Sequence, residues 1–280
     1  ISLKKIYTIL HSDGNDDSIP FLNVDAIDYC TFGNSKPFRI KIRNILNDNY
    51  TYFYVKTADA SRVYGLELEH MLSPYNLNFL VYKNTLIEEH IAGIPGDEFI
   101  KDFLPKCDKS EKSQIAKEFV KFNERCMIRL LGDMRSYNYV IVPTHDFDKV
   151  VYKIRAIDFD QQSYEGRSSI YHPKYFKQNN PIIQLGIQHM DPVTVRQYQT
   201  EERAMIASRI RYSRDQINSI VATMRHTTIA PYAHVSKLRQ DLAKDYKNDA
   251  FLHCQNMGEI VELSLILVLE AHQADAVRWR

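Results

Sequence analysis

Hydrophobic and polar positions alternate as in β-strands over the first third of the chain, and over most of the rest they recur at helical spacing. Five short segments rich in β-branched and aromatic residues predict strands, at residues 24–31, 38–43, 50–57, 78–83 and 85–90. Residues 59–73 predict a helix, because a capping residue opens the segment and Pro74 lies just past its end. Short turns join the first three strands, which predicts an antiparallel meander.

The pattern changes at residues 92–96, Ala-Gly-Ile-Pro-Gly, where two glycines and a proline interrupt it. Asp108 and Glu111 have the spacing of a capping box, and apolar residues then recur every three or four positions to Leu130, which predicts a long helix. A hairpin is expected at 139–143 and 150–157, followed by a long loop at 158–180. Helical spacing also marks residues 97–104, 201–210, 213–224, 235–246 and 256–271, with a second capping-box candidate at Ser213 and Gln216.

These elements predict an α+β, bilobal protein. Residues 1–91 are expected to form a small lobe with a five-stranded antiparallel sheet and one helix, and residues 92–96 a hinge. Residues 97–280 are expected to form a larger, mostly helical lobe that contains the hairpin. A chain of 280 residues is long enough to bury a sizeable core without disulfides or metals.

The composition and charge of the chain exclude several classes of protein. Apolar residues make up 44% of the chain and charged residues 25%, which excludes a disordered or low-complexity protein. The net charge of +1 does not suit a protein that grips the nucleic-acid backbone. Four widely spaced cysteines without a CxxC pair predict free thiols in a reducing, cytoplasmic compartment, with no structural zinc. No segment is long enough for a membrane span, and the opening residues, with Lys4 and Lys5, do not suit a signal peptide.

Two carboxylates and an amide flank the predicted hairpin. Asp133 follows the long helix, Asn138 directly precedes the first hairpin strand, and Asp158 follows the second strand in the triplet Ile-Asp-Phe. Oxygen ligands of this kind suit Mg²⁺, which proteins often hold jointly with phosphate. The pattern resembles the protein-kinase-like fold, whose catalytic loop has Asp, four residues and Asn, and whose metal-binding Asp precedes Phe. The Leu-Gly-Asp form of the loop is similar to the aminoglycoside phosphotransferase and HipA-like branches of that fold.

The resemblance implies a lysine on the third strand, with a glutamate partner on the following helix. Lys56 ends the third predicted strand, in Tyr-Phe-Tyr-Val-Lys. At 100° per residue, Glu67 falls within the apolar face of the helix and Glu69 lies nearly opposite. Because an unpaired buried charge is costly, we expect Glu67 to pair with Lys56 and Glu69 to be a solvated surface charge.

The resemblance also implies a place for the nucleotide. The turn between the first two strands contains Gly33 and Ser35, whose backbone and hydroxyl groups would contact phosphate. The segment that runs into the hinge, represented by Glu89 and Ile91, would bind adenine through its backbone. Asp160 occupies the position of a family glycine, where it would face a second metal ion or hydrogen-bond its own loop.

The function that the resemblance implies is an ATP- and Mg²⁺-dependent phosphotransferase, a kinase with a hydroxyl group of a small molecule or protein as acceptor. Lys56 would hold the phosphates, Asn138 and Asp158 would bind Mg²⁺, and Asp133 would take up the acceptor proton. One alternative is a pseudokinase, a nucleotide-binding or protein-interaction module, which the single glycine of the phosphate turn favours. Another is an unrelated α+β binding protein in which these matches are accidental.

Overall fold

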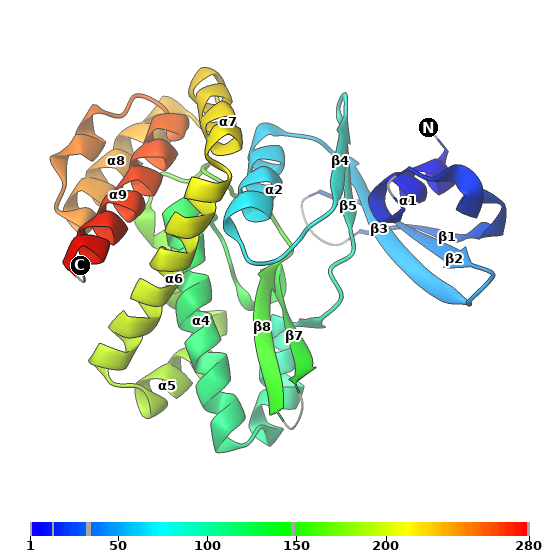
Figure 1. Ribbon diagram of the computed structural model, residues 1–280, viewed down its shortest axis with the longest axis horizontal. Helices are drawn as coiled ribbons and strands as arrows, with labels where there is room; N and C mark the ends of the chain where they lie inside the picture. The colour runs from blue at the N-terminus through cyan, green and yellow to red at the C-terminus, as the bar shows by residue number, and fades with distance from the viewer. Residues whose placement is uncertain (1, 13, 32–34, 147–148, 279–280) are drawn as a thin grey trace. The chain divides into compact units, whose positions relative to one another are not determined.

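The computed structural model describes residues 2–12, 14–31, 35–146 and 149–278, and it is an α+β protein with a five-stranded antiparallel sheet and a mostly helical remainder (Figure 1). The chain forms two compact units. The small unit comprises Ile1–Asp59 and Asn76–Ile91, and the large unit comprises Ala60–Tyr75 and Ala92–Arg280. Each unit has a buried core of its own.

The sheet of the small unit has the strand order β1–β2–β3–β5–β4, with all neighbours antiparallel. Its strands are β1 (Leu22–Tyr29), β2 (Phe38–Asn44), β3 (Asn49–Thr57), β4 (Phe79–Tyr82) and β5 (Thr85–Glu89). Strand alternation directs Ile40, Ile42 and Phe53 into the core, where each is at most 2% exposed. The five strands predicted from the sequence are thus confirmed, with ends shifted by one or two residues.

Helix α1 (Leu3–His11) completes the core of the small unit. Ile6 and Leu10 belong to the same buried cluster as Ile40 and Phe53. The Ser2 side chain caps the helix by accepting a hydrogen bond from the backbone N–H of Lys5. This helix was not among the elements predicted from the sequence. A short 3₁₀ helix, η1 (Asp16–Phe21), leads from α1 into β1.

The large unit is built mainly of helices around α4. Its helices are α2 (Ala60–Leu72), α4 (Lys109–Arg129), α5 (Asn180–His189), α6 (Pro192–Tyr212), α7 (Arg214–His226), α8 (Tyr232–Tyr246) and α9 (Met257–Arg278), with short turns α3 (Gly96–Glu98), η2 (Phe99–Phe103), η3 (Leu104–Lys106), η4 (Ser136–Asn138), η5 (Ser168–Tyr171), η6 (Pro173–Tyr175), η7 (Lys177–Asn179) and η8 (Asp249–His253). Strands β6 (Ile94–Pro95), β7 (Tyr139–Asp146) and β8 (Lys149–Ala156) form an antiparallel sheet. Helix α4 packs against α5, α6, α9 and β8.

Helix α4 begins as the sequence predicts. The Asp108 side chain accepts from the backbone N–H of Glu111, and the Glu111 side chain accepts from the backbone N–H of Asp108, so the capping box is complete. The helix ends at Leu130, whose φ of 59° is left-handed and closes the last turn. By contrast, Ser213 at the start of α7 makes no capping hydrogen bond with its side chain.

Two predictions about the division of the chain need correction. Helix α2, which the sequence assigned to the N-terminal lobe, belongs to the large unit, where Leu68 and Leu72 join the same buried cluster as Ile206. The predicted hinge 92–96 contains strand β6, which pairs with β7 inside the large unit. A Cβ atom at Gly93 would lie 2.8 Å from the Val140 side chain, so the close approach of these strands requires glycine.

The remaining differences concern helices and turns. Strand β7 is three residues longer than predicted, whereas β8 has the predicted length and lies one residue earlier; residues 147–148, within the predicted turn, lie outside the described residues. Helix α5 was not predicted at all, and α6 begins nine residues earlier than the expected 201–210. Among the residues that the structure describes, no helix combines the length and the apolar character that crossing a membrane requires.

Candidate active site

The open end of the β7–β8 hairpin places Asn138 and Asp158 close together along the backbone. Tyr139 pairs with Ala156, and just beyond that pair the N–H of Ile157 donates to the carbonyl of Asn138 at 3.0 Å. Asn138 directly precedes β7, and Asp158 follows this hydrogen bond by one residue. The two residues therefore leave the hairpin at the same end, as the sequence predicts.

Backbone hydrogen bonds fix Asp133 beside Asn138. The Asp133 carbonyl accepts from the Asn138 side-chain amide at 2.8 Å, and its N–H donates to the carbonyl of Ile170 at 3.1 Å. The φ of Asp133 is 55°, in the left-handed region that aspartate tolerates better than most residues. Such backbone conformations cost free energy and cluster at functional sites, where the surrounding structure maintains them. Asp133 and Asn138 therefore close one turn at the end of the hairpin.

The Asp133 carboxylate is accessible and has one charged partner. Its Oδ1 accepts from Nε of Arg135 at 2.7 Å, and the two side chains are 29% and 39% exposed. The Arg135 guanidinium also lies over the Phe176 ring, 5.4 Å from its centroid. Arg135 was not predicted as a site residue, although its position two residues after Asp133 indicates that the two charges lie near each other.

Asn138 and Asp158 have oxygen atoms suited to a cation. Because the Asn138 amide nitrogen donates to Asp133, its amide oxygen is left to accept or to coordinate. Asp158 Oδ1 accepts a bond of 3.3 Å from the backbone N–H of Asp160. Within the described part of the chain, no three His, Cys, Asp or Glu side chains are grouped to hold a metal ion by themselves. These residues thus fit a Mg²⁺ ion shared with substrate phosphate, which needs only one or two protein carboxylates.

The segment after Asp158 is anchored to helix α2 inside the large unit. The Asp160 carboxylate lies 3.7 Å from the guanidinium of Arg62, so it makes an ion pair in addition to the other contacts of the loop. Phe159 is 2% exposed, and a Cβ atom at Gly65 would approach its Cβ to 2.9 Å. Gly65 therefore permits close packing of α2 on this segment. A glycine inside a helical pattern is a sequence signal for such a close approach, and Gly65 was not used in predicting the site.

In the small unit, Lys56 has a buried partner on the neighbouring strand. Its Nζ lies 2.7 Å from Oε2 of Glu88, and the two side chains are 9% and 7% exposed. Glu88 Oε1 is buried without a hydrogen-bond partner among the described residues. In the β3–β5 register Lys56 is opposite Leu86, so Glu88 is its diagonal neighbour on the same face. Strand alternation predicts that Lys56 and Glu88 share a face of the sheet, whereas the predicted partners of Lys56 were all on the following helix.

Tyr54 and His90 lie near the Lys56–Glu88 pair in the sheet. Tyr54 is directly opposite Glu88, and its hydroxyl lies 3.3 Å from Nδ1 of His90. Burial raises the pKa of the Tyr54 phenol and lowers the pKa of His90 from 6.5. Both groups are therefore neutral near pH 7, and together they present an uncharged aromatic surface beside the buried ion pair.

The predicted environments of Glu67 and Glu69 are wrong. Glu69, expected at the surface, is 4% exposed and forms an ion pair with Arg129 of α4, which is 2% exposed. Glu67, expected inside the apolar face, is only half-buried, and burial raises the pKa of its carboxyl group. The helical pattern of α2 alone does not show that α4 places the Arg129 cation against Glu69. The pairing of Lys56 with Glu67 stays a prediction.

The residues predicted to contact nucleotide in the small unit are only partly described. Gly33 lies outside the described residues. Ser35, which directly follows the undescribed residues 32–34 in the sequence, is half-buried. The N–H groups of Glu89 and His90 already donate to the carbonyls of Asn78 and Tyr52, at 3.0 Å each. Ile91 is 8% exposed, and its role in binding adenine stays a prediction.

No model of a known protein family matches this sequence, and no curated protein is significantly similar to it.

Proposed function

We propose that this protein is an ATP- and Mg²⁺-dependent phosphotransferase that transfers a phosphoryl group to a hydroxyl acceptor of a small molecule or protein. The observation that supports it best is the joint placement of Asp133, Asn138 and Asp158 around the open end of one hairpin. Phosphoryl transfer needs little covalent chemistry from the protein, and a metal-binding pair with a nearby carboxylate supplies much of what it requires.

Each residue has a defined role in this proposal. The oxygens of Asn138 and Asp158 hold Mg²⁺, which neutralises charge on the phosphate oxygens. Asp133 accepts the proton of the acceptor hydroxyl, and its exposed carboxylate suits a group that must reach a substrate. Lys56 binds phosphate oxygens, and for this its ammonium group must share or leave Glu88. Asp160, paired with Arg62, positions the loop that carries Asp158.

A second candidate, a pseudokinase that binds nucleotide or a protein partner without transfer, has specific support. Two of the three charged groups assigned to chemistry already have a neutralising partner: Asp133 pairs with Arg135, and Lys56 pairs with Glu88. In a protein that only binds, these pairs would persist. In an active enzyme, substrate and nucleotide must compete with them.

Titration of the full chain with ATP, in Mg²⁺ and again in EDTA, tests the proposal. We expect saturable binding that depends on Mg²⁺ and a raised melting temperature, because a ligand at 100 times its Kd stabilises the folded state by about 2.7 kcal/mol. Hydrolysis or transfer of the γ-phosphate distinguishes the enzyme from the pseudokinase. An absence of both binding heat and melting shift would contradict the phosphotransferase and the nucleotide-binding form of the pseudokinase.

A further inference from the structure

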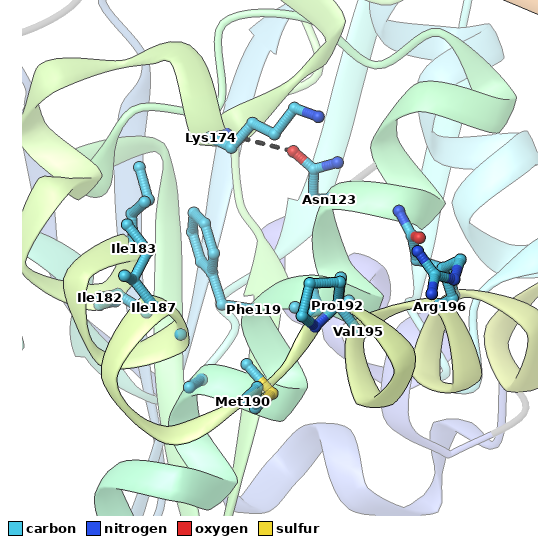
Figure 2. Close-up of a pocket in the computed structure, with 14 residues that line it drawn as sticks. Phe119, Asn123, Lys174, Ile182, Ile183, Ile187, Met190, Pro192, Val195 and Arg196 are labelled. Carbon is cyan, nitrogen blue, oxygen red and sulfur yellow. Dashed lines mark hydrogen bonds between the residues drawn. The ribbon is translucent and has the colours of Figure 1, made fainter.

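A pocket of about 560 Å³ lies in the large unit between α4, α5 and the start of α6 (Figure 2). Its volume is within the range of small-molecule sites, and its lining includes none of the residues assigned to phosphoryl transfer. The apolar walls come from all three helices and include Phe119, Ile182, Ile183, Ile187 and Val195. Because Ile182 is 1% exposed and Ile187 is 68% exposed, the apolar surface extends from a buried floor to an open mouth.

The polar groups of the pocket gather on one side. In Figure 2, the amide of Asn123 and the nitrogen ends of Lys174 and Arg196 lie on the side away from the three isoleucines. The Asn123 oxygen accepts from the backbone N–H of Lys174 at 3.1 Å, which fixes this edge of the pocket. Lys174 and Arg196 are exposed, and neither makes an ion pair with a described carboxylate.

Carboxylates close to this edge are occupied elsewhere. Glu124 accepts from Arg203 and from Gln199, and Glu201 pairs with Lys121 at 2.9 Å. Asp191 caps α6 by accepting from the backbone N–H of Thr194 at 2.7 Å. The Asp191 carboxylate also interacts electrostatically with Arg196. Neither Lys174 nor Arg196 is in a close ion pair with a described carboxylate, so the pocket combines an apolar interior with two exposed cationic groups.

We propose that this pocket binds a single-chain anionic amphiphile, with its carboxylate beside Arg196 and Lys174 and its hydrocarbon chain against the isoleucines of α5. Arg196 can donate two parallel hydrogen bonds to a carboxylate, and the site excludes a cationic head group by charge repulsion. Burial of each additional methylene strengthens binding roughly fourfold. This site is independent of the proposed phosphotransferase activity.

Calorimetric titration of the full chain with dodecanoate, kept below its micelle concentration, tests the ligand class. We expect binding of one molecule per chain, roughly sixteenfold tighter than that of decanoate, because two more methylenes are buried. Dodecyltrimethylammonium has the same chain and the opposite charge, and we expect it to bind at least tenfold more weakly. Equal affinity for the two head groups, or no binding of dodecanoate, would overturn the proposal.

Two variants test the location. A Cβ atom at Gly186 would meet only the end of the flexible Met190 side chain, at 3.4 Å, so Gly186→Leu fills the pocket without a backbone clash. We expect Gly186→Leu to abolish dodecanoate binding and Arg196→Ala to weaken it about tenfold, whereas Lys177→Ala, an exposed lysine outside the lining, leaves it unchanged. A thermal melt checks that Gly186→Leu is folded, and Arg196→Ala carries the test if it is not.

Two outcomes would assign the pocket to something else. If a folded Gly186→Leu variant and Arg196→Ala both bind dodecanoate like the original protein, the amphiphile binds elsewhere and the proposal is wrong. If the original protein is a dimer in solution and Gly186→Leu is a monomer, a second copy of the chain covers this face, and the proposal is equally overturned.

Discussion

Lys56 in the small unit and Asp133 in the large unit each have an ion-pair partner, but the two pairs differ in burial. Lys56 and Glu88 are less than 10% exposed and lie on neighbouring strands of a regular sheet. Asp133 and Arg135 are 29% and 39% exposed, and Asp133 is held by its backbone in a left-handed turn. The Lys56 ammonium is held in place by its ion pair. Asp133 is held by its backbone, and its carboxylate stays accessible. We infer that Lys56 needs its partner for stability and that Asp133 does not.

If burial decides the cost of losing a partner, the Glu69–Arg129 pair in the core of the large unit gives a larger effect than the pairs of Lys56 and Asp133. We expect Glu69→Ala to lower the free energy of unfolding by about 3–5 kcal/mol, because it leaves Arg129 charged and unpaired in the core. Glu67→Ala, two positions away on α2 and half-buried, is the matched control and should change it by less than about 1 kcal/mol. Urea denaturation of both variants measures the difference, and equal effects would show that burial is not the deciding factor.

The buried pair of the small unit gives the next effect. Glu88→Ala should cost about 3 kcal/mol of unfolding free energy, since Lys56 loses its partner at 9% exposure. Replacing both residues, as Lys56→Met with Glu88→Leu, should restore most of that stability, because no buried charge remains. The double variant should still fail to bind nucleotide tightly. Chemical denaturation and nucleotide titration on the same samples separate the two roles, and a double variant as unstable as Glu88→Ala would contradict this explanation.

The exposed pair gives the smallest effect. Arg135→Ala should change the free energy of unfolding by less than about 1 kcal/mol, because solvent-exposed ion pairs contribute little. A loss above about 2 kcal/mol would mean that Arg135, and not the backbone, holds the Asp133 turn. Urea denaturation of Arg135→Ala measures this change in the free energy of unfolding.

Local patterns predicted much of this fold. The capping box of α4 and the five strands of the small unit are features of short sequence segments, and the structure contains them. The hairpin that brings Asn138 and Asp158 to one end is equally local, because its two strands are close in sequence. The position of Asn138 and Asp158 at the same end of the hairpin could therefore be predicted from the sequence alone.

Features that depend on distant parts of the chain could not be predicted in this way. The burial of Glu69 depends on Arg129, which lies 60 residues further along the chain. Helix α5 buries only two apolar residues, Ile182 and Leu185, and contains Gly186, which has a low helix propensity, so its sequence has a weak helical signal. The assignment of α2 to the large unit likewise follows from packing against residues far away in sequence.

The proposed function is tested most directly by measuring nucleotide affinity and γ-phosphate turnover together on Asp158→Ala and Asp133→Ala. Asp158→Ala removes a negative metal ligand, so Mg²⁺-dependent ATP binding should weaken at least tenfold and turnover should disappear. Asp133→Ala should keep ATP affinity within a few fold and lose turnover by about 10²–10⁴-fold, the usual contribution of a general base. Asp215→Ala, an exposed carboxylate on α7, is the control and should match the original protein in both measurements. Full turnover in Asp133→Ala, together with unchanged ATP affinity in Asp158→Ala, would contradict the proposal.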